Sequence, residues 1–225
     1  MKTVTGIILL AGASTRYNKG INKNLDSLED KLVITHSIKK FLNNDLIDEI
    51  VLVIRPEDID EILEDINTNT EKNKSIKLVP GGKTRQESVY NGLKIVDSDI
   101  VLIHDGARPL VKDRFIRSCI ESMDEYDAST IAVKSKDTIK LGNENDEVVE
   151  TTNRDNTWII QTPQCFNTEL LKIAHEKYRN ETMTDDCALM EREGIKVKLL
   201  EGDYTNIKIT TREDMEIVKK LIKKQ

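Results

Sequence analysis

The chain has 225 residues, of which 38% are hydrophobic and 33% are charged, and its formal net charge at pH 7 is −6. This length and composition allow one substantial core, so we expect one domain over residues 1–225. The acidic balance argues against binding nucleic acid through a broad basic face. Cys119, Cys165 and Cys187 lie far apart without a CxxC pair, which predicts neither disulfides nor a zinc site and fits a reducing cytoplasm.

Apolar runs rich in Val and Ile predict buried parallel strands at residues 4–10, 49–54, 76–79, 100–103 and 128–133. Apolar residues recur at helical spacing between them, around residues 32–42, 59–66, 89–96 and 115–123. Strand and helix therefore alternate, which favours an α/β fold with a doubly wound, mostly parallel, Rossmann-like sheet. The first run is too short for a membrane span and lacks a signal-peptide cleavage context, so no membrane association is expected.

The alternation breaks at residues 137–152, where two β-type stretches, 138–141 and 148–151, flank a turn-rich segment. This pattern predicts a protruding hairpin. Its polar composition would be difficult to bury in a monomer, so we expect an arm at about residues 135–156 that packs against a partner, with projection into water as the alternative. Helices at 170–178 and 187–193, a strand at 197–200 and a final helix opened by a capping box at Thr211 to Asp214 should follow.

The first candidate site follows the first strand, where Ala11, Gly12 and Ala13 precede Arg16 and Lys23. Ligands bind at such strand ends in doubly wound sheets. A glycine lets the backbone approach a phosphate, and the two basic side chains supply positive charge. The loop matches neither the Walker A pattern nor G-x-G-x-x-G, which disfavours a P-loop NTPase or a Rossmann dehydrogenase. An ordinary turn with exposed basic residues would explain it equally well.

Two more polar loops follow later strands. Gly82 and Ser88 belong to a loop that opens a helix, where they could contact a flat polar ligand such as a base. Asp105 and Arg108 come directly after the fourth strand, and they could bind Mg²⁺ and a phosphate respectively. The competing explanations are a helix cap for the first pair and a structural ion pair for the second.

The second half of the chain contains further polar clusters, each of which could be only a turn or a cap. They are Lys136-Asp137-Thr138, Arg154-Asp155, Thr162-Pro163-Gln164, Thr184-Asp185-Asp186 and Asn206-Ile207-Lys208. Thr184 would be a plausible N-cap, because two acidic residues follow it at the expected helix start.

Taken in order, these loops resemble those of the 2-C-methyl-D-erythritol 4-phosphate cytidylyltransferase family over almost the whole chain. The family's first loop resembles A-A-G-x-G-x-R-M followed by P-K-Q, and residues 10–17 and 22–24 match it with Arg16 and Lys23 in place. Ser14 stands where a glycine is usual, and Asn22 replaces the proline. The sequences G-G-x-x-R-x-x-S at residues 81–88 and H-D-G-A-R-P at residues 104–109 also resemble family motifs.

The resemblance implies a nucleotidyltransferase-type fold and a homodimer whose arms clasp each other. It implies an enzyme that transfers the cytidylyl group of CTP to a small polyol phosphate in isoprenoid precursor synthesis, with Mg²⁺ or another divalent cation near Asp105. The implied roles are charge stabilisation and assistance at the reacting centre by Arg16, Lys23 and Lys208, nucleotide binding by Ala11, Gly12, Ala13, Gly82 and Ser88, and acceptor binding by Asp105, Arg108, Thr138, Arg154, Thr162 and Thr184.

Three alternatives remain open at this point. A ribitol 5-phosphate cytidylyltransferase would share the fold, the nucleotide and the chemistry but use another acceptor. A regulatory protein could keep the nucleotide site without catalysis, although binding alone would not demand Arg16, Lys23, Asp105 and Lys208 together. A pyrophosphorylase for another base is disfavoured by the short chain and by the Gly82 and Ser88 pair.

Overall fold

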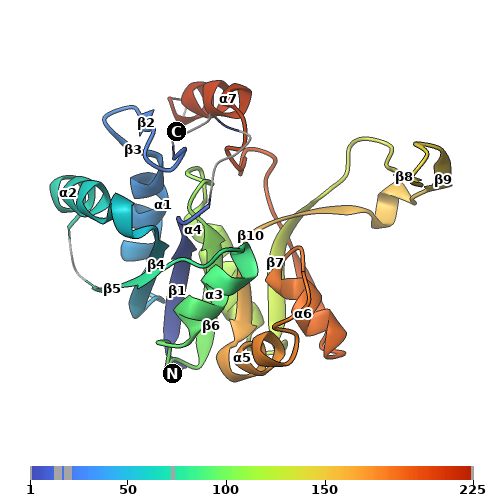
Figure 1. The fold of residues 1–225 in the computed structure, drawn as a ribbon, viewed down its shortest axis with the longest axis horizontal. Coiled ribbons are helices and arrows are strands. Elements are labelled where there is room, and N and C mark those ends of the chain that lie inside the picture. The colour runs from blue at the N-terminus through green and yellow to red at the C-terminus, as the bar shows by residue number, and fades with distance from the viewer. Residues whose placement is uncertain (1, 13–16, 18–21, 72–73, 224–225) are drawn as a thin grey trace.

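The computed structural model describes residues 2–12, 17, 22–71 and 74–223 (Figure 1). Their centre is a seven-stranded sheet in the order β11-β7-β10-β6-β1-β4-β5. The strands are β1 (Val4–Leu9), β4 (Glu49–Ile54), β5 (Ser75–Pro80), β6 (Ile100–Asp105), β7 (Ala128–Lys134), β10 (Trp158–Asn167) and β11 (Val197–Glu201). The pairs β6-β1, β1-β4, β4-β5 and β11-β7 are parallel, whereas β10 runs antiparallel to both β6 and β7. The expected mostly parallel α/β sheet is confirmed.

Helices cover both faces of the sheet (Figure 1). One face carries α1 (Val33–Leu42), α2 (Ile59–Asn69) and α4 (Asp113–Ser122), whose apolar residues share one buried cluster with β1, β4 and β6. The other face carries α3 (Arg85–Leu93), α5 (Thr168–Lys177) and α6 (Asp186–Arg192), which share a second cluster. Burying both faces explains why the inner parallel strands β1, β4 and β6 are largely apolar rather than alternating.

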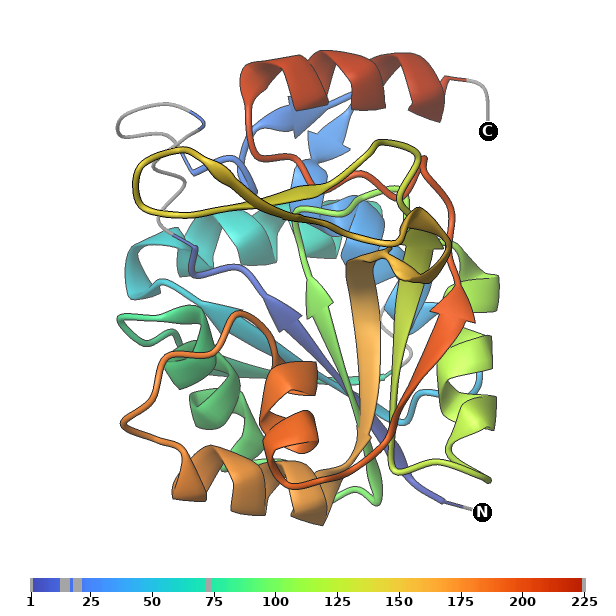
Figure 2. The same cartoon turned by 90° about the vertical axis from the view of Figure 1, so that its right-hand side faces the viewer.

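The last helix, α7 (Arg212–Ile222), lies over the end of the sheet from which the arm also projects (Figure 2). Its Met215 and Val218 pack with Tyr17 and Leu28 in a third, smaller cluster. Leu28 belongs to a short ladder of β2 (Ser27–Leu28) and β3 (Lys31–Leu32) that the apolar pattern did not predict. The predicted capping box is confirmed, since the Thr211 and Asp214 side chains each accept a backbone N–H of the other residue.

The predicted hairpin is present as β8 (Lys140–Gly142) and β9 (Val148–Thr151), followed by the short helix η2 (Arg154–Asn156). It extends well away from the body of the molecule (Figure 1). Its first strand begins two residues later than expected. The residues of both strands are exposed, including apolar Leu141 at 48%, Val148 at 64% and Val149 at 67%.

One strand of the central sheet was not expected. β10 contains Thr162, Pro163 and Gln164, for which the sequence suggested only a turn or a cap. The Thr162-Pro163 peptide bond is cis, and the pairing of β10 with β7 shifts between Ile160 and Gln164. Proline cannot donate to a ladder, so a central strand tolerates it only at such an irregularity. Among the helices described here, none is both long enough and apolar enough to cross a membrane.

Candidate active site

A cavity of about 280 Å³ lies at the carboxyl ends of β1, β5 and β6. We call it the first cavity, and the residues lining it are Leu9, Ala11, Gly12, Lys23, Asn24, Gly82, Lys83, Thr84, Arg85, Ser88, Asp105, Ala107 and Lys208. Seven predicted site residues are therefore brought together from four separate segments of the chain: Ala11, Gly12, Lys23, Gly82, Ser88, Asp105 and Lys208. The predicted residues Ala13 and Arg16 lie outside the described part of the chain.

The loop before α3 is folded back onto the first turn of that helix. Ser88 Oγ accepts the Gly82 N–H at 3.0 Å and donates to the Thr84 carbonyl at 2.9 Å. The Thr84 hydroxyl in turn caps α3 by accepting the Glu87 N–H. A Cβ on Gly81 would lie 2.1 Å from the Ala11 Cβ, so only glycine lets this loop contact the end of β1. The shape of the first cavity thus depends on the close approach of the Gly81 backbone to Ala11.

Asp105 is surrounded by three cations. Its carboxylate lies 2.8 Å from Lys208 Nζ, 3.5 Å from Arg85 Nε and 3.9 Å from Arg108 Nε. Burial alone would raise the pKa of the Asp105 carboxyl, but Arg85, Lys208 and Arg108 outweigh it and hold that pKa well below its ordinary value. Arg85 is also paired with Asp186, so three positive charges face two carboxylates in this cluster. The local excess of positive charge that remains favours an anionic ligand, despite the acidic chain as a whole.

Arg85 is a residue of this site that the sequence reasoning missed. Its Nη1 donates to Asp186 Oδ2 at 2.7 Å, and Asp186 Oδ1 lies 2.9 Å from His175 Nε2. Asp186 and His175 are both buried. Burial alone would lower the pKa of Arg85, but Asp186 and Asp105 raise it above its ordinary value. The arginine of the G-G-x-x-R-x-x-S motif was the signal, whereas Asp186 and His175 had none.

A second cavity, also about 280 Å³, adjoins the first. Its lining consists of Arg85, Asp105, Arg108, Ile160, Gln161, Thr162, Gln164, Thr184, Asp185 and Lys208. It therefore contains four of the predicted acceptor-binding residues, namely Asp105, Arg108, Thr162 and Thr184. Arg85, Asp105 and Lys208 line both cavities. Two ligands occupying the two cavities would meet beside these three charged side chains.

Strand β10 joins the floor of the second cavity to Asp105. Thr162 Oγ1 accepts the Asp105 N–H at 3.1 Å and lies 3.0 Å from His104 Nδ1. The Asn206 amide donates to the Thr162 carbonyl at 3.0 Å, and Arg108 Nη1 donates to the Asn206 carbonyl at 2.7 Å. Burial lowers the pKa of His104 to about 3, so its ring is neutral near pH 7. These bonds hold Arg108 and the segment that leads to Lys208 against β10.

The expected cap at Thr184 is wrong, because the N-cap of α6 is Asp185, whose side chain accepts the Ala188 N–H at 3.0 Å. Gln164 Nε2 also donates to Asp185, at 2.7 Å. An ionised side chain is the better acceptor at this position, because it also interacts favourably with the helix dipole. Thr184 is consequently left on the wall of the second cavity.

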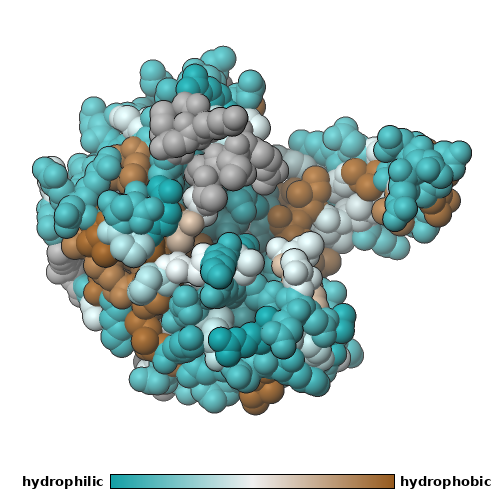
Figure 3. Space-filling view, viewed as in Figure 1, coloured by the Kyte–Doolittle hydropathy of each residue, from teal (hydrophilic) through white to brown (hydrophobic). Residues whose placement is uncertain are grey.

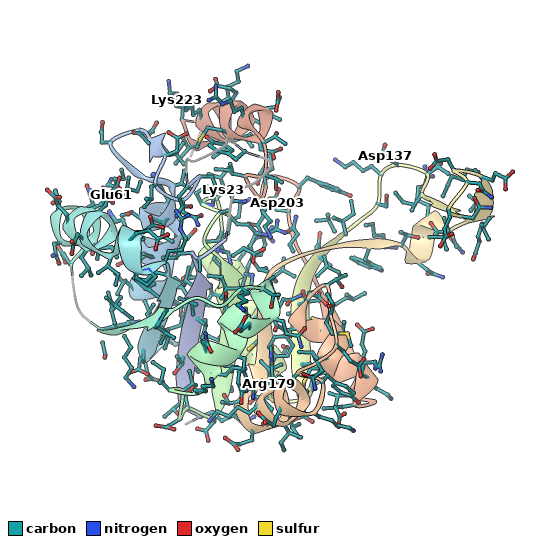
Figure 4. The ribbon with its side chains drawn as sticks, viewed as in Figure 1. Lys23, Glu61, Asp137, Arg179, Asp203 and Lys223 are labelled. Carbon is teal, nitrogen blue, oxygen red and sulfur yellow. The ribbon has the colours of Figure 1, made fainter. Side chains whose placement is uncertain are left out.

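Thr138 and Arg154 line neither cavity of their own chain. Arg154 begins η2 on the arm, and Thr138 precedes β8. Figure 4 shows the neighbouring Asp137 on the arm, whereas Lys23 lies over the body. Within a single chain, therefore, these two predicted acceptor-binding residues are not brought to the site.

Asp105 is the only acidic residue among the described residues lining the first cavity. The described part of the chain contains no group of three His, Cys, Asp or Glu side chains placed to hold a metal ion. Mg²⁺ is commonly bound by one or two carboxylates together with substrate phosphates. The donor set thus fits a cation that arrives with a polyphosphate, and it does not fit a metal centre made by the protein alone.

Comparisons with known proteins identify one family. The family model for 2-C-methyl-D-erythritol 4-phosphate cytidylyltransferases matches residues 4–224. A relative from Caldanaerobacter subterraneus subsp. tengcongensis that bears the same name is 45% identical over 225 residues, covering 98% of this chain and 99% of the relative. A Clostridium botulinum protein of that name is 44% identical over 222 residues, covering 97% and 96%.

A solved structure is also similar throughout its length. The 4-diphosphocytidyl-2C-methyl-D-erythritol synthase from Anaerococcus prevotii superimposes with a TM-score of 0.88 at 34% identity, covering 99% of both chains. The family model covers nearly the entire sequence, and the relatives match end to end at more than 40% identity. The chain therefore belongs to the 2-C-methyl-D-erythritol 4-phosphate cytidylyltransferase family.

Proposed function

We propose that this enzyme transfers the cytidylyl group of CTP to 2-C-methyl-D-erythritol 4-phosphate, giving 4-diphosphocytidyl-2-C-methyl-D-erythritol and pyrophosphate for isoprenoid precursor synthesis. The observation that carries the proposal is the pair of cavities sharing Arg85, Asp105 and Lys208, because a transfer reaction needs two anionic substrates side by side. Family membership favours methylerythritol phosphate over ribitol phosphate as the acceptor.

The reaction needs no protein nucleophile. An oxygen of the acceptor's phosphate attacks the α-phosphorus of CTP in line, a new P–O bond forms, and the bond from the α-phosphorus to the bridging oxygen breaks to release pyrophosphate. The attacking oxygen is already anionic, so no general base is required. Catalysis then depends on positioning and on stabilising the negative charge of the transition state.

The first cavity would hold CTP. Gly82, Ser88 and the Ala11 backbone would contact cytosine, while Gly12 and Ala13 would bring backbone amides to the triphosphate. Lys23, together with Arg16, would stabilise the charge that builds on the α-phosphate. All of these except Ala13 and Arg16 line the cavity in the described part of the chain.

Lys208 would act where the two substrates meet. Its Nζ lies 2.8 Å from Asp105 and borders both cavities, so a small movement would transfer it from the carboxylate to a substrate phosphate. Arg85 and Arg108 would remain beside Asp105. Asp105 would be the protein ligand of a Mg²⁺ ion, which when bound would neutralise part of the triphosphate charge.

The arm would complete the acceptor site of a second subunit. Arg108 and Thr184 of one subunit, with Thr138 and Arg154 of the other, would hold the acceptor's phosphate. The exposed apolar residues Leu141, Val148 and Val149 of the arm support a dimer, because a partner would cover them, and Figure 3 shows apolar patches on the arm.

The three cysteines are buried and unpaired, which supports a reducing cytoplasm.

The activity is tested with the purified protein, Mg²⁺ and each nucleoside triphosphate, offered methylerythritol 4-phosphate and ribitol 5-phosphate side by side. Pyrophosphate should be released with CTP and methylerythritol 4-phosphate. No release with either acceptor would refute the catalytic proposal, and release with ribitol 5-phosphate alone would reassign the acceptor.

The role of Lys23 is tested by Lys23→Ala. Loss of one preorganised electrostatic donor lowers kcat by roughly 10²–10³-fold. Lys219→Ala, which removes a lysine paired with Glu216 at 3.1 Å on the solvent side of α7, is the matched control and should leave kcat unchanged. Near-wild-type kcat in Lys23→Ala would exclude the assigned role.

A further inference from the structure

Lys23 lies in a turn between two buried asparagines. The Leu25 N–H donates to the Asn22 carbonyl at 2.9 Å, which closes the turn, and only 5% of Asn22 and 2% of Asn24 are exposed. The Asn24 amide donates to the Leu10 carbonyl at 2.8 Å, so the turn is attached to the end of β1. The backbone on both sides of Lys23 is therefore anchored.

The other anchor is made by the Asn22 side chain. Its Nδ2 donates to Asp58 Oδ2 at 2.6 Å, and its Oδ1 accepts the Asn24 N–H at 3.1 Å. Asp58 is buried at the end of the short helix η1 (Pro56–Asp58), where Arg55 donates to both of its oxygens at 2.7 and 3.2 Å. One buried amide thus connects the turn carrying Lys23 to the segment that follows β4.

Residue 22 is also where this chain departs from the family pattern, which has proline before the lysine. A proline ring restricts the backbone by holding φ near −65°, and it removes conformational freedom that would otherwise oppose one fixed geometry. Asparagine has no ring, so the restriction must come from elsewhere. A hydrogen bond to a buried carboxylate that an arginine also holds in place is among the stronger restraints that a side chain can provide.

We propose that Asn22 is a positioning residue, which holds Lys23 at the first cavity through its hydrogen bond to Asp58 and thereby replaces the restraint of the family's proline. The inference rests on the proposed role of Lys23. Asn22 and Asp58 do not line the first cavity, whereas Lys23 and Asn24 do. The effect of Asn22 therefore passes through the turn rather than through contact with a substrate.

The test compares Asn22→Ala, Asp58→Ala, Asn22→Pro and the double variant N22P/D58A in the pyrophosphate assay. Asn22→Ala and Asp58→Ala should each lower kcat about tenfold, because this factor corresponds to the lower end of the energy of one hydrogen bond to a charged group. The KM for CTP should stay within about twofold of the wild-type value. Asn22→Pro should keep kcat within about threefold of wild type. Asp58→Ala should then cost almost nothing in the proline background, because the ring makes the bond to Asp58 unnecessary.

Asn44 provides a matched control. It is fully buried, its Nδ2 donates to Asp113 at 2.7 Å, and its Oδ1 accepts the Leu46 N–H at 3.0 Å, which repeats the bonding of Asn22. Asn44 follows α1 and precedes β4, away from both cavities. Asn44→Ala should lower Tm as Asn22→Ala does and leave kcat unchanged, which separates positioning from loss of stability.

Lys23→Ala and the double variant N22A/K23A complete the series. If Asn22 acts through Lys23, the double variant should be no slower than Lys23→Ala. Wild-type kcat in Lys23→Ala would overturn both the proposed role of Lys23 and this inference. A large loss in Lys23→Ala combined with unchanged kcat in Asn22→Ala, or an undiminished effect of Asp58→Ala in the proline background, would overturn the inference alone.

Discussion

Two inactive variants should restore activity when they are paired in one dimer. Lys23 lines the first cavity of its own chain, whereas Arg154 on the arm lines neither cavity of that chain. If the arm reaches the partner, each site takes Lys23 from one subunit and Arg154 from the other. Lys23→Ala and Arg154→Ala homodimers should therefore both keep little activity, because every one of their sites lacks one group.

The expected recovery follows from counting sites in the heterodimer. The body of the Lys23→Ala chain meets the altered arm, so that site lacks both groups. The body of the Arg154→Ala chain has Lys23 and meets an intact arm, so that site is complete. One site in two is intact, and the heterodimer should show about half of wild-type kcat per subunit, since a two-fold axis makes the two sites equivalent.

The assay uses two differently tagged chains that are co-expressed and purified by both tags in succession, followed by pyrophosphate release. The mirror arrangement is the control: a chain carrying K23A and R154A, paired with an unaltered chain, has one altered group in each site and should be inactive. If Arg154 served its own chain, the results would be reversed, with half activity in the mirror heterodimer and none in the first. That reversal would refute the arm's role.

Three predictions concern the scaffold of the site. Thr162→Val removes the buried hydroxyl that accepts the Asp105 N–H, so the free energy of unfolding in urea should fall by about 1–3 kcal/mol; an unchanged midpoint would show that the hydroxyl contributes nothing. The pKa of His104 is about 3 in the folded protein against about 6.5 unfolded, so the unfolded chain binds more protons between these values and stability is lost as pH falls through that window. Between pH 6.5 and 4.5, the free energy of unfolding of the wild type should fall by about 2 kcal/mol more than that of His104→Gln. His36, whose pKa is also lowered by burial, is present in both proteins and affects them alike. An equal dependence of unfolding free energy on pH in the two proteins would contradict the buried neutral ring of His104. Thr211→Ala removes the cap of α7 and should cost about 1 kcal/mol in thermal unfolding, compared with little change for exposed Thr68→Ala on α2, and equal effects of the two would argue against the cap.

Much of the fold could be predicted because the signals are local. The strands at Glu49–Ile54 and Val148–Thr151 have the bounds expected from their β-type runs, and the capping box at Thr211 depends only on residues within one turn. The carboxyl ends of parallel strands meet at one edge of a sheet, so loops following separate strands were expected to converge. For that reason Gly12, Gly82 and Asp105 could be assigned to one site before the structure was considered.

Other features depend on pairings between distant segments. Pro163 suggests an interruption by itself, and only the ladders of β10 with β6 and β7, together with their register shift, make that segment a central strand. In the sequence, Asp186 and His175 are ordinary helix residues. In the folded protein they are buried beside Arg85, where Asp186 accepts a hydrogen bond from Arg85 and contacts His175. From the local sequence, more than one of residues 184–186 could serve as the N-cap of α6. In the structure the N-cap is Asp185, which also accepts a hydrogen bond from Gln164 on the distant strand β10.

Apart from β10 and the short β2-β3 ladder, the sequence by itself therefore determined the order of strands and helices, the protruding hairpin and the loops that carry the chemistry. Periodicity, capping and turn preferences act over a few residues, which is why they can be read locally. Only the tertiary structure decided which charges surround Asp105, that β10 forms the floor of the second cavity, and that a buried Asn22 anchors Lys23 to Asp58. These depend on burial and on contacts between residues far apart in the chain, where a hydrogen bond or an ion pair forms only after the whole sheet has brought its partners together.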